Sequence, residues 1–159
     1  MDEQEVTDPD RVLVGIDGSP SSIEALRYAA RVAEAFSAPL EVVTTWAYPP
    51  YASPYTADAW SPEEDAKTIL HDSVEAAFGS TPPALRRTVL AGPPARMLIE
   101  ESKTCGMLVL GSRGHGGFAG LLLGSVSSAC AEHAHCPVLI VHGQGSSPEV
   151  TPLGAGEAG

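Results

Sequence analysis

Short apolar runs alternate with longer amphipathic stretches along this sequence, and that alternation constrains the fold more than any other feature. Five apolar runs are typical of strands buried on both faces: residues 11–17, 40–46, 86–91, 107–110 and 137–142. Each run is separated from the next by a stretch that has apolar residues at helical spacing. Since a strand–helix–strand unit returns the chain in the same direction, this order predicts an α/β fold, with a parallel sheet and helices on both faces.

Serine–proline pairs mark two of the expected helix starts. Ser19-Pro20 and Ser61-Pro62 each place a helix-capping serine before a proline that fits the first turn. The first pair follows the strand that ends at Asp17. Ligands of parallel sheets bind at the carboxyl ends of the strands, so Asp17 is a candidate site residue. Its carboxylate could bond the turn that follows it, or hold Mg²⁺ that bridges phosphates.

Residues 11–142 are expected to form one domain. Residues 1–10 indicate a disordered acidic arm, and residues 143–159, rich in Gly, Ser, Pro and Ala, indicate a disordered tail. The formal net charge is −11, but seven of the 20 acidic residues lie in these two ends. The domain itself, with 13 acidic and nine basic residues, is near −4. This acidity argues against a nucleic-acid-binding protein, which needs a basic surface, but permits one anionic ligand that is held locally.

Nothing in the sequence indicates a membrane or a secretory pathway. No apolar run approaches the roughly 20 residues that span a bilayer. Residues 1–10 lack the basic start and the apolar stretch of a secretory signal. The three cysteines are too few for a disulfide framework. A cytoplasmic location without a membrane partner is therefore expected.

A glycine-rich segment from Gly111 to Gly124 follows the fourth expected strand and leads into a helix at Ser125. Glycines allow close backbone approach, successive amides can form a concave anion site, and a helix N-terminus attracts phosphate. Backbone amides could thus bind a phosphate without lysines, whereas a flexible surface loop is the alternative interpretation. Arg113 is the only charged residue from Gly111 to Ser125, and it could contact the phosphate or lie in solvent.

Two common nucleotide-binding motifs do not explain this segment. A Walker A loop needs a lysine after its glycines, and Lys67 and Lys103 lie far from any glycine run. Residues 114–119 match the loose dinucleotide fingerprint, but they follow the fourth strand and lie well before the next helix. We attribute that match to chance.

Two further features have more than one interpretation. The aromatic and proline-rich loop Tyr48 to Trp60 could stack on a base, cover a partner or pack against the sheet. The group Cys130, His133, His135 and Cys136 has the ligand types of a zinc site. The last two of these residues lie on the turn into a strand, where side chains diverge, so zinc is the weaker interpretation.

The spacing Gly111-x2-Gly114-x9-Gly124-Ser125 resembles the nucleotide-binding signature of the universal stress protein family, in its ATP-binding subgroup. Four flanking segments agree with this resemblance: VLVGIDGSPSS, VLAGPP, LVLGSRGHGG and CPVLIV. The resemblance covers about residues 11–142, and the tyrosine- and proline-rich loop is similar to that of actinobacterial members.

The resemblance implies an open, Rossmann-like sheet of five parallel strands in the order 3-2-1-4-5. It also implies binding of ATP or a related adenine nucleotide with Mg²⁺, with Asp17 close to the nucleotide and its metal. The residues implied around the adenine and the sugar are Gly15, Ile16, Thr45, Leu110 and Gly111. The residues implied around the phosphates are Gly114, Gly124, Ser125, Val126 and Ser127, to which the loop chemistry adds Arg113.

Family members commonly dimerise through the last strand, here Val138 to His142. The sequence therefore predicts a cytoplasmic, homodimeric adenine-nucleotide-binding protein of the stress response, which acts by nucleotide-dependent conformation or partner binding. A slow ATPase or nucleotidyl-transferring enzyme with the same pocket, a cyclic-nucleotide-binding protein and a non-nucleotide interaction module are the alternatives. No nucleophile–base pair and no paired carboxylates are recognisable, so at most slow ATP hydrolysis is expected.

Overall fold

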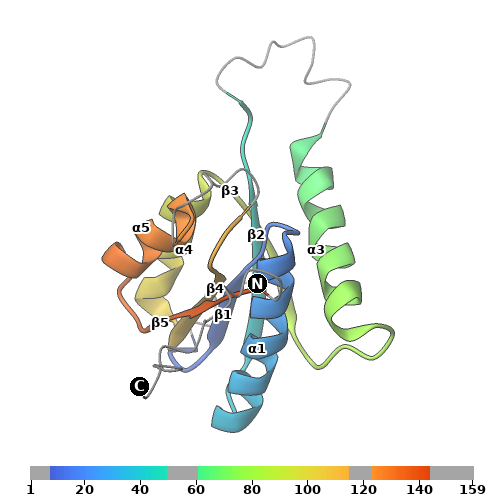
Figure 1. Ribbon diagram of the computed structural model, residues 1–159, viewed down its shortest axis with the longest axis vertical. Helices are drawn as coiled ribbons and strands as arrows, with labels where there is room; N and C mark the ends of the chain where they lie inside the picture. Colours follow the sequence, from blue (N-terminus) through green and yellow to red (C-terminus); the bar gives the residue numbers. More distant parts are fainter. Residues whose placement is uncertain (1–7, 50–60, 115–122, 144–159) are drawn as a thin grey trace, which may run out of the picture.

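In the computed structural model, which describes residues 8–49, 61–114 and 123–143, a five-stranded parallel sheet lies between two helical layers (Figure 1). Its strand order is β3-β2-β1-β4-β5. The strands are β1 (Val12–Gly15), β2 (Leu40–Trp46), β3 (Arg86–Ala91), β4 (Met107–Gly111) and β5 (Val138–Val141). Every neighbouring pair is parallel. The predicted fold class and strand order are confirmed.

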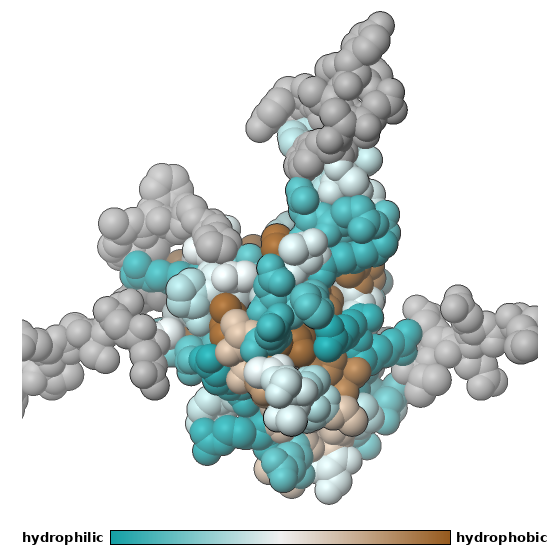
Figure 2. All heavy atoms as spheres, turned by 90° about the vertical axis from the view of Figure 1, so that its right-hand side faces the viewer, coloured by the Kyte–Doolittle hydropathy of each residue, from teal (hydrophilic) through white to brown (hydrophobic). Residues whose placement is uncertain are grey.

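The helices form two layers, one on each face of the sheet (Figure 1). Their bounds are α1 (Pro20–Phe36), α3 (Pro62–Phe78), α4 (Pro94–Glu101) and α5 (Ser125–His133), with a short 3-10 helix, η1 (Ser102–Thr104). The helices α1 and α3 pack together on one face, and α4 and α5 pack together on the other. Figure 2 shows the side of α1 and α3, where hydrophilic residues cover most of the surface and apolar residues show between them.

This division of the helices follows from the direction in which the chain crosses the sheet. The chain moves outward from β1 through β2 to β3, then returns to the centre and moves outward again through β4 and β5. Since each crossover between parallel strands is right-handed, a reversal of direction places the next helices on the opposite face. The reversal therefore lies between β1 and β4.

The central strand β1 is buried along its whole length, and its side chains alternate between two cores. Val12 and Val14 belong to the core beneath α1 and α3, together with Leu26 of α1. Leu13 belongs to the core beneath α4 and α5, together with Leu98. A strand with two buried faces requires apolar residues at every position, which explains the nearly continuous apolar run in the sequence.

Several side chains form hydrogen bonds with the unpaired backbone groups at the helix ends. Ser19 and Ser61 each accept a hydrogen bond from the backbone amide three residues later, at 3.3 Å in both cases, as predicted for capping serines. Arg27 of α1 donates to the carbonyls of Ala76 and Ala77, at 2.9 and 3.3 Å. These carbonyls lie in the last turn of α3, where they lack partners within the helix. Arg27 thus joins the two helices of this layer.

A buried arginine, Arg11, joins the amino ends of the central strands to the helical layer that contains α4. Arg11, 6% exposed, lies directly before β1. Its Nε lies 3.4 Å from a carboxylate oxygen of Glu41, and its Nη2 donates to Glu101 at 2.9 Å. A third contact joins its guanidinium to the carbonyl of Thr104. These charged groups lie together at the edge of the sheet opposite to the carboxyl strand ends.

Four of the sequence predictions concern residues outside the described ranges. These residues are most of the acidic arm, nearly all of the tail, the loop Tyr48 to Trp60 beyond its first two residues, and residues 115–122 of the glycine-rich segment. None of the described helices is long and apolar enough to cross a membrane.

Candidate functional site

A cavity of about 710 Å³ opens at the carboxyl ends of β1, β2 and β4. Its walls come from these strand ends, the turn after β3, the starts of α4 and α5, and one side chain of α3, Ile69. The helices that follow β1 and β4 leave on opposite faces of the sheet, so a crevice remains between the two strand ends. Strand order thus accounts for the position of the cavity.

All twelve site residues predicted from the sequence line this one cavity. They come from four separate segments: Gly15, Ile16, Asp17, Thr45, Leu110, Gly111, Arg113, Gly114, Gly124, Ser125, Val126 and Ser127. The parallel register brings them together, because Gly15 pairs with Val43 of β2 and with Leu110 of β4. Residues far apart in sequence therefore reach the same sheet edge.

Sequence reasoning missed part of the lining. The additional residues are Ser22, Val43, Thr44, Trp46, Ala47, Ile69, Gly92, Pro94, Leu98, Leu123 and Ser128. Trp46 and Gly92 could have been found, because each lies at or directly after the carboxyl end of a strand. The ring of Trp46 makes an edge contact with Tyr48, with 5.5 Å between centroids. Ile69 carried no such signal, since its position depends on how α3 packs.

The segment after β4 is anchored to the start of α1. The Ser21 hydroxyl donates to the carbonyl of Arg113 and accepts from the Arg113 amide at 3.3 Å. The Ser19 hydroxyl also donates to this carbonyl, at 3.3 Å. These contacts hold the beginning of the glycine-rich segment against the helix that follows β1.

A second set of hydrogen bonds anchors the other end of this segment. The amide of Gly124 donates to the carbonyl of Ser112 at 2.7 Å. The Ser127 hydroxyl lies 3.0 Å from this carbonyl and 3.1 Å from that of Gly124. Since a hydroxyl has one proton, Ser127 uses its donor within the fold. Ser127 therefore serves the cavity by holding its wall in place.

The amino end of α5 presents backbone amides to the cavity. Gly124 is the residue before this helix, and it offers no side chain to cap the first turn. The first hydrogen bond within the helix runs from the Ser128 amide to the Gly124 carbonyl, at 2.9 Å. The amides of Ser125, Val126 and Ser127 thus have no partner inside the helix. Such amides, together with the helix dipole, favour an anion.

Asp17 lies beside the glycine-rich segment. Its Oδ1 accepts a hydrogen bond from the Ser19 amide at 2.9 Å, which is the turn geometry that its position predicts. Its Oδ2 faces Gly114 so closely that a Cβ at Gly114 would overlap it. A side chain at position 114 would therefore displace the Asp17 carboxylate from this position.

Residues 9–142 match the model of the universal stress protein family. The chain belongs to this family. Universal stress protein Rv2623 of Mycobacterium tuberculosis is 33% identical to it over 162 residues, which cover 93% of this chain and 54% of the relative. This chain thus spans about half the length of the curated relatives that it matches.

Solved universal stress proteins have the same fold. The protein UspA from Lactobacillus plantarum has a TM-score of 0.69 at 22% identity, covering 84% of this chain and 97% of its own. A universal stress protein solved in complex with cAMP has a TM-score of 0.63 at 31% identity, with the same two coverages.

The glycines of the family signature differ in what the fold requires of them. A Cβ at Gly111 would lie 2.5 Å from the Ser21 hydroxyl and 2.8 Å from the Ser22 amide. A Cβ at Gly124 would lie 3.5 Å from its nearest neighbours, which is an ordinary contact. The backbone of Gly124 is extended, with φ −70° and ψ 170°, so other residues can adopt it. Packing explains the glycine at 111 but not the glycine at 124.

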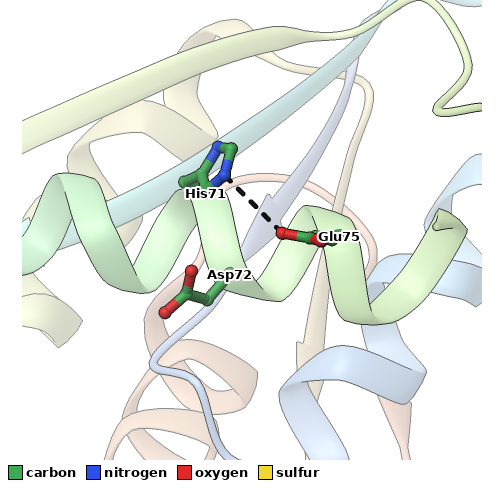
Figure 3. Close-up of side chains that lie close together, drawn as sticks. All are labelled: His71, Asp72 and Glu75. Atoms are coloured by element: carbon green, nitrogen blue, oxygen red, sulfur yellow. Dashed lines mark ion pairs between the residues drawn. The ribbon is translucent and has the colours of Figure 1, made fainter. Parts of the chain in front are cut away.

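The described residues do not form a zinc site from Cys130, His133, His135 and Cys136. Cys130 is fully buried, whereas both histidines are exposed. The group that lies within metal-binding distance in the described ranges is instead His71, Asp72 and Glu75 on α3 (Figure 3). These side chains are exposed, and His71 Nε2 lies 3.6 Å from Glu75, as pairs four residues apart on a helix often do. We assign no metal to either group.

Alanine substitutions test whether packing requires a glycine at position 111 but not at position 124. Gly111→Ala is expected to lower the free energy of unfolding by about 1–3 kcal/mol, because the new Cβ overlaps the start of α1. Gly124→Ala is expected to change it by less than about 0.5 kcal/mol. Urea denaturation followed by circular dichroism measures both. Equal destabilisation by the two variants would contradict the difference in packing.

Proposed function

We propose that this universal stress protein binds an adenine nucleotide, ATP with Mg²⁺, in the cavity at the carboxyl ends of β1 and β4. The observation that carries the proposal is the meeting of all twelve predicted residues in one cavity, together with the first amides of α5, which have no partner inside that helix. A volume of about 710 Å³ falls in the range of small-molecule sites.

The two sides of the cavity differ in chemistry in the way that a nucleotide requires. Trp46 of β2 and Ile69 of α3 supply apolar surface, which suits a planar base. The other side is formed by Gly114 and the first turn of α5, where amides suit phosphate oxygens. A base toward β2 and phosphates toward α5 is the orientation that this arrangement supports.

Asp17 fits the metal that accompanies a nucleoside triphosphate. A carboxylate oxygen is a ligand type that Mg²⁺ prefers, and the ion is commonly held by one or two carboxylates with phosphate oxygens and water. Asp17 lies at the cavity wall between Ser19 and Gly114, beside the proposed phosphate side. When bound, the ion would offset the negative charge between this carboxylate and the phosphates.

We further propose that the protein acts in the cytoplasm, where ATP is available, by nucleotide-dependent conformation or partner binding. Among the described residues that line the cavity, Asp17 is the only carboxylate and none is a histidine. This composition favours binding over turnover, because hydrolysis needs a group that positions or deprotonates water.

A cyclic nucleotide is a second candidate ligand. The observation that favours it is the 31% identical universal stress protein solved in complex with cAMP, which this chain covers over 97% of its length. Both nucleotides present adenine and phosphate. They differ in that a triphosphate recruits Mg²⁺ strongly and a cyclic monophosphate does not.

Calorimetry with ATP and Mg²⁺, on protein stripped of carried-over nucleotide, tests the site. We expect measurable binding heat, and a rise in melting temperature with ATP concentration.

In Gly124→Val the new side chain lies against the Gly114 amide, which a Cβ at 124 already approaches to 3.5 Å. Loss of one charge-assisted hydrogen bond costs roughly 1.5–3 kcal/mol, so binding is expected to weaken roughly 10- to 100-fold.

Ala131→Val is the matched control for that variant. Ala131 lies on the exposed face of α5, and the substitution adds the same β-branched side chain away from the cavity. Its affinity is expected to equal that of the unmodified protein. The proposal would be overturned if ATP and cAMP both gave no binding heat and no thermal stabilisation.

The role of Asp17 is tested by Asp17→Asn, which keeps the oxygen that accepts from the Ser19 amide. Mg²⁺ is expected to strengthen ATP binding to the unmodified protein and to have little effect on the variant. Without Mg²⁺ the variant is expected to bind ATP at least as tightly, because a negative charge near the phosphates has been removed. The same response to Mg²⁺ in both proteins would show that Asp17 holds no metal.

We also propose that two copies of the chain pair through β5. This strand lies at one end of the sheet, and all four of its side chains are half-buried. The carbonyls of Pro137 and Val141 accept hydrogen bonds from the β4 side, so the backbone groups of Val138 and Ile140 face the open edge. An apolar open edge favours pairing with another strand, and most homodimers have two-fold symmetry.

Ile140→Pro tests this interface, because proline removes an outward-facing N–H donor while edge strands tolerate it. Sedimentation equilibrium is expected to give a dimer for the unmodified protein and a monomer for the variant. Ile140→Val, which keeps the donor, should remain dimeric. A monomeric unmodified protein at every concentration tested would contradict the proposal.

A further inference from the structure

The three cysteines of this chain lie in one apolar cluster beneath α4 and α5. Cys105 lies between η1 and β4, Cys130 lies on α5, and Cys136 lies between α5 and β5. The sulfur atoms of Cys105 and Cys136 are 3.6 Å apart, although the two residues are 31 positions apart in sequence. None of the three cysteines lines the proposed nucleotide site, and Cys105 and Cys136 lie near the amino ends of β4 and β5, away from the cavity.

Strand pairing brings Cys105 and Cys136 together. Leu108 of β4 pairs with Val138 of β5, and the Leu108 amide donates to the Pro137 carbonyl at 2.9 Å. Cys105 and Cys136 each lie two residues before the start of their strand, so this pairing brings them close together. A disulfide needs the two sulfur atoms to approach from 3.6 Å to about 2.05 Å.

The two thiols differ in exposure. Cys105 is 8% exposed, and burial, with a smaller contribution from Cys136, raises the pKa of its thiol to about 12. The positive charge of Arg11 acts in the opposite direction and favours the thiolate. Cys136 is only half-buried. A small reagent can thus reach Cys136 first, and Cys105 is the neighbour that completes the reaction.

We propose that Cys105 and Cys136 are a redox-active dithiol that closes reversibly to a disulfide by exchange with a small-molecule disulfide of the glutathione class. The Cys136 thiolate attacks one sulfur of the reagent, whose S–S bond breaks and releases one small thiolate. The Cys105 thiol then loses its proton to that thiolate or to water and attacks the Cys136 sulfur, which releases the second small thiolate. Two protein thiols are oxidised, and one reagent disulfide is reduced to two thiols.

The disulfide would tie the amino end of β4 to the turn before β5. The segment that it closes contains β4, the glycine-rich wall of the cavity and α5. Cross-linking residues 31 positions apart restricts the unfolded chain, and the expected rise in melting temperature is on the order of 10 °C. Reversible disulfides of this kind are compatible with a reducing cytoplasm.

The test exposes the full chain to mixtures of oxidised and reduced glutathione, then quenches with acid and alkylates the remaining thiols. Intact mass and peptide mapping are expected to show a Cys105–Cys136 disulfide with Cys130 still reduced. The oxidised protein should melt at the higher temperature, and dithiothreitol should reverse both changes. Disulfide formation does not require nucleotide binding, so the outcome is independent of the calorimetry.

Three variants separate the steps. Cys130→Ala should still form the disulfide, because Cys130 takes no part in it. Cys105→Ser should accumulate the mixed disulfide between glutathione and Cys136, since the attacking thiol is missing. Cys136→Ser should form neither a protein disulfide nor a mixed disulfide with glutathione at Cys105. Thiols that stay reduced in oxidising mixtures, a Cys130–Cys136 bond, or a lower melting temperature after oxidation would each overturn the proposal.

Discussion

The pairing of β1 with β2 on one side and β4 on the other is the interaction on which the rest of the structure depends. It places β1 at the centre of the sheet, buries both faces of that strand, and sets the point at which the chain reverses its direction of travel. The cavity lies at this reversal, because the helices after β1 and β4 leave on opposite faces. The parallel pairing of β4 with β5 also brings Cys105 and Cys136 into contact near the amino ends of these two strands.

Hydrogen bonds of serine side chains help to hold the walls of the cavity in place. Ser19 and Ser21 hold the segment after β4 against α1, and Ser127 holds it against α5. These bonds position backbone amides, which attract an anion without a lysine or arginine in the first turn of α5. A domain with a charge near −4 can therefore contain a site suited to phosphate, because most acidic residues of the described helices are exposed on the outer surface.

Serine has two uses in this arrangement, and only the structure separates them. The sequence places Ser125 and Ser127 in the same stretch with the same expected role. In the structure Ser125 is exposed at the start of α5, whereas Ser127 is 3% exposed and bonded to two carbonyls. The glycines divide in a similar way: packing against α1 accounts for Gly111, but no neighbour accounts for Gly124. A glycine without a packing reason at the cavity wall agrees with a close approach by a ligand.

The sequence by itself determined the strands and the helix starts, because these depend on local signals. The twelve predicted cavity residues came from the resemblance to the universal stress protein family together with the chemistry of the glycine-rich segment. Apolar runs, capping serines and glycine spacing can each be recognised without knowing what packs against them. Tertiary structure decided that Ile69 of α3 reaches the cavity, that the Ser127 hydroxyl is used within the fold, and that Cys136 meets Cys105, a residue outside the candidate zinc group. Each of these depends on distances between elements that are remote in the chain, and such distances are set by packing and strand register rather than by neighbouring residues.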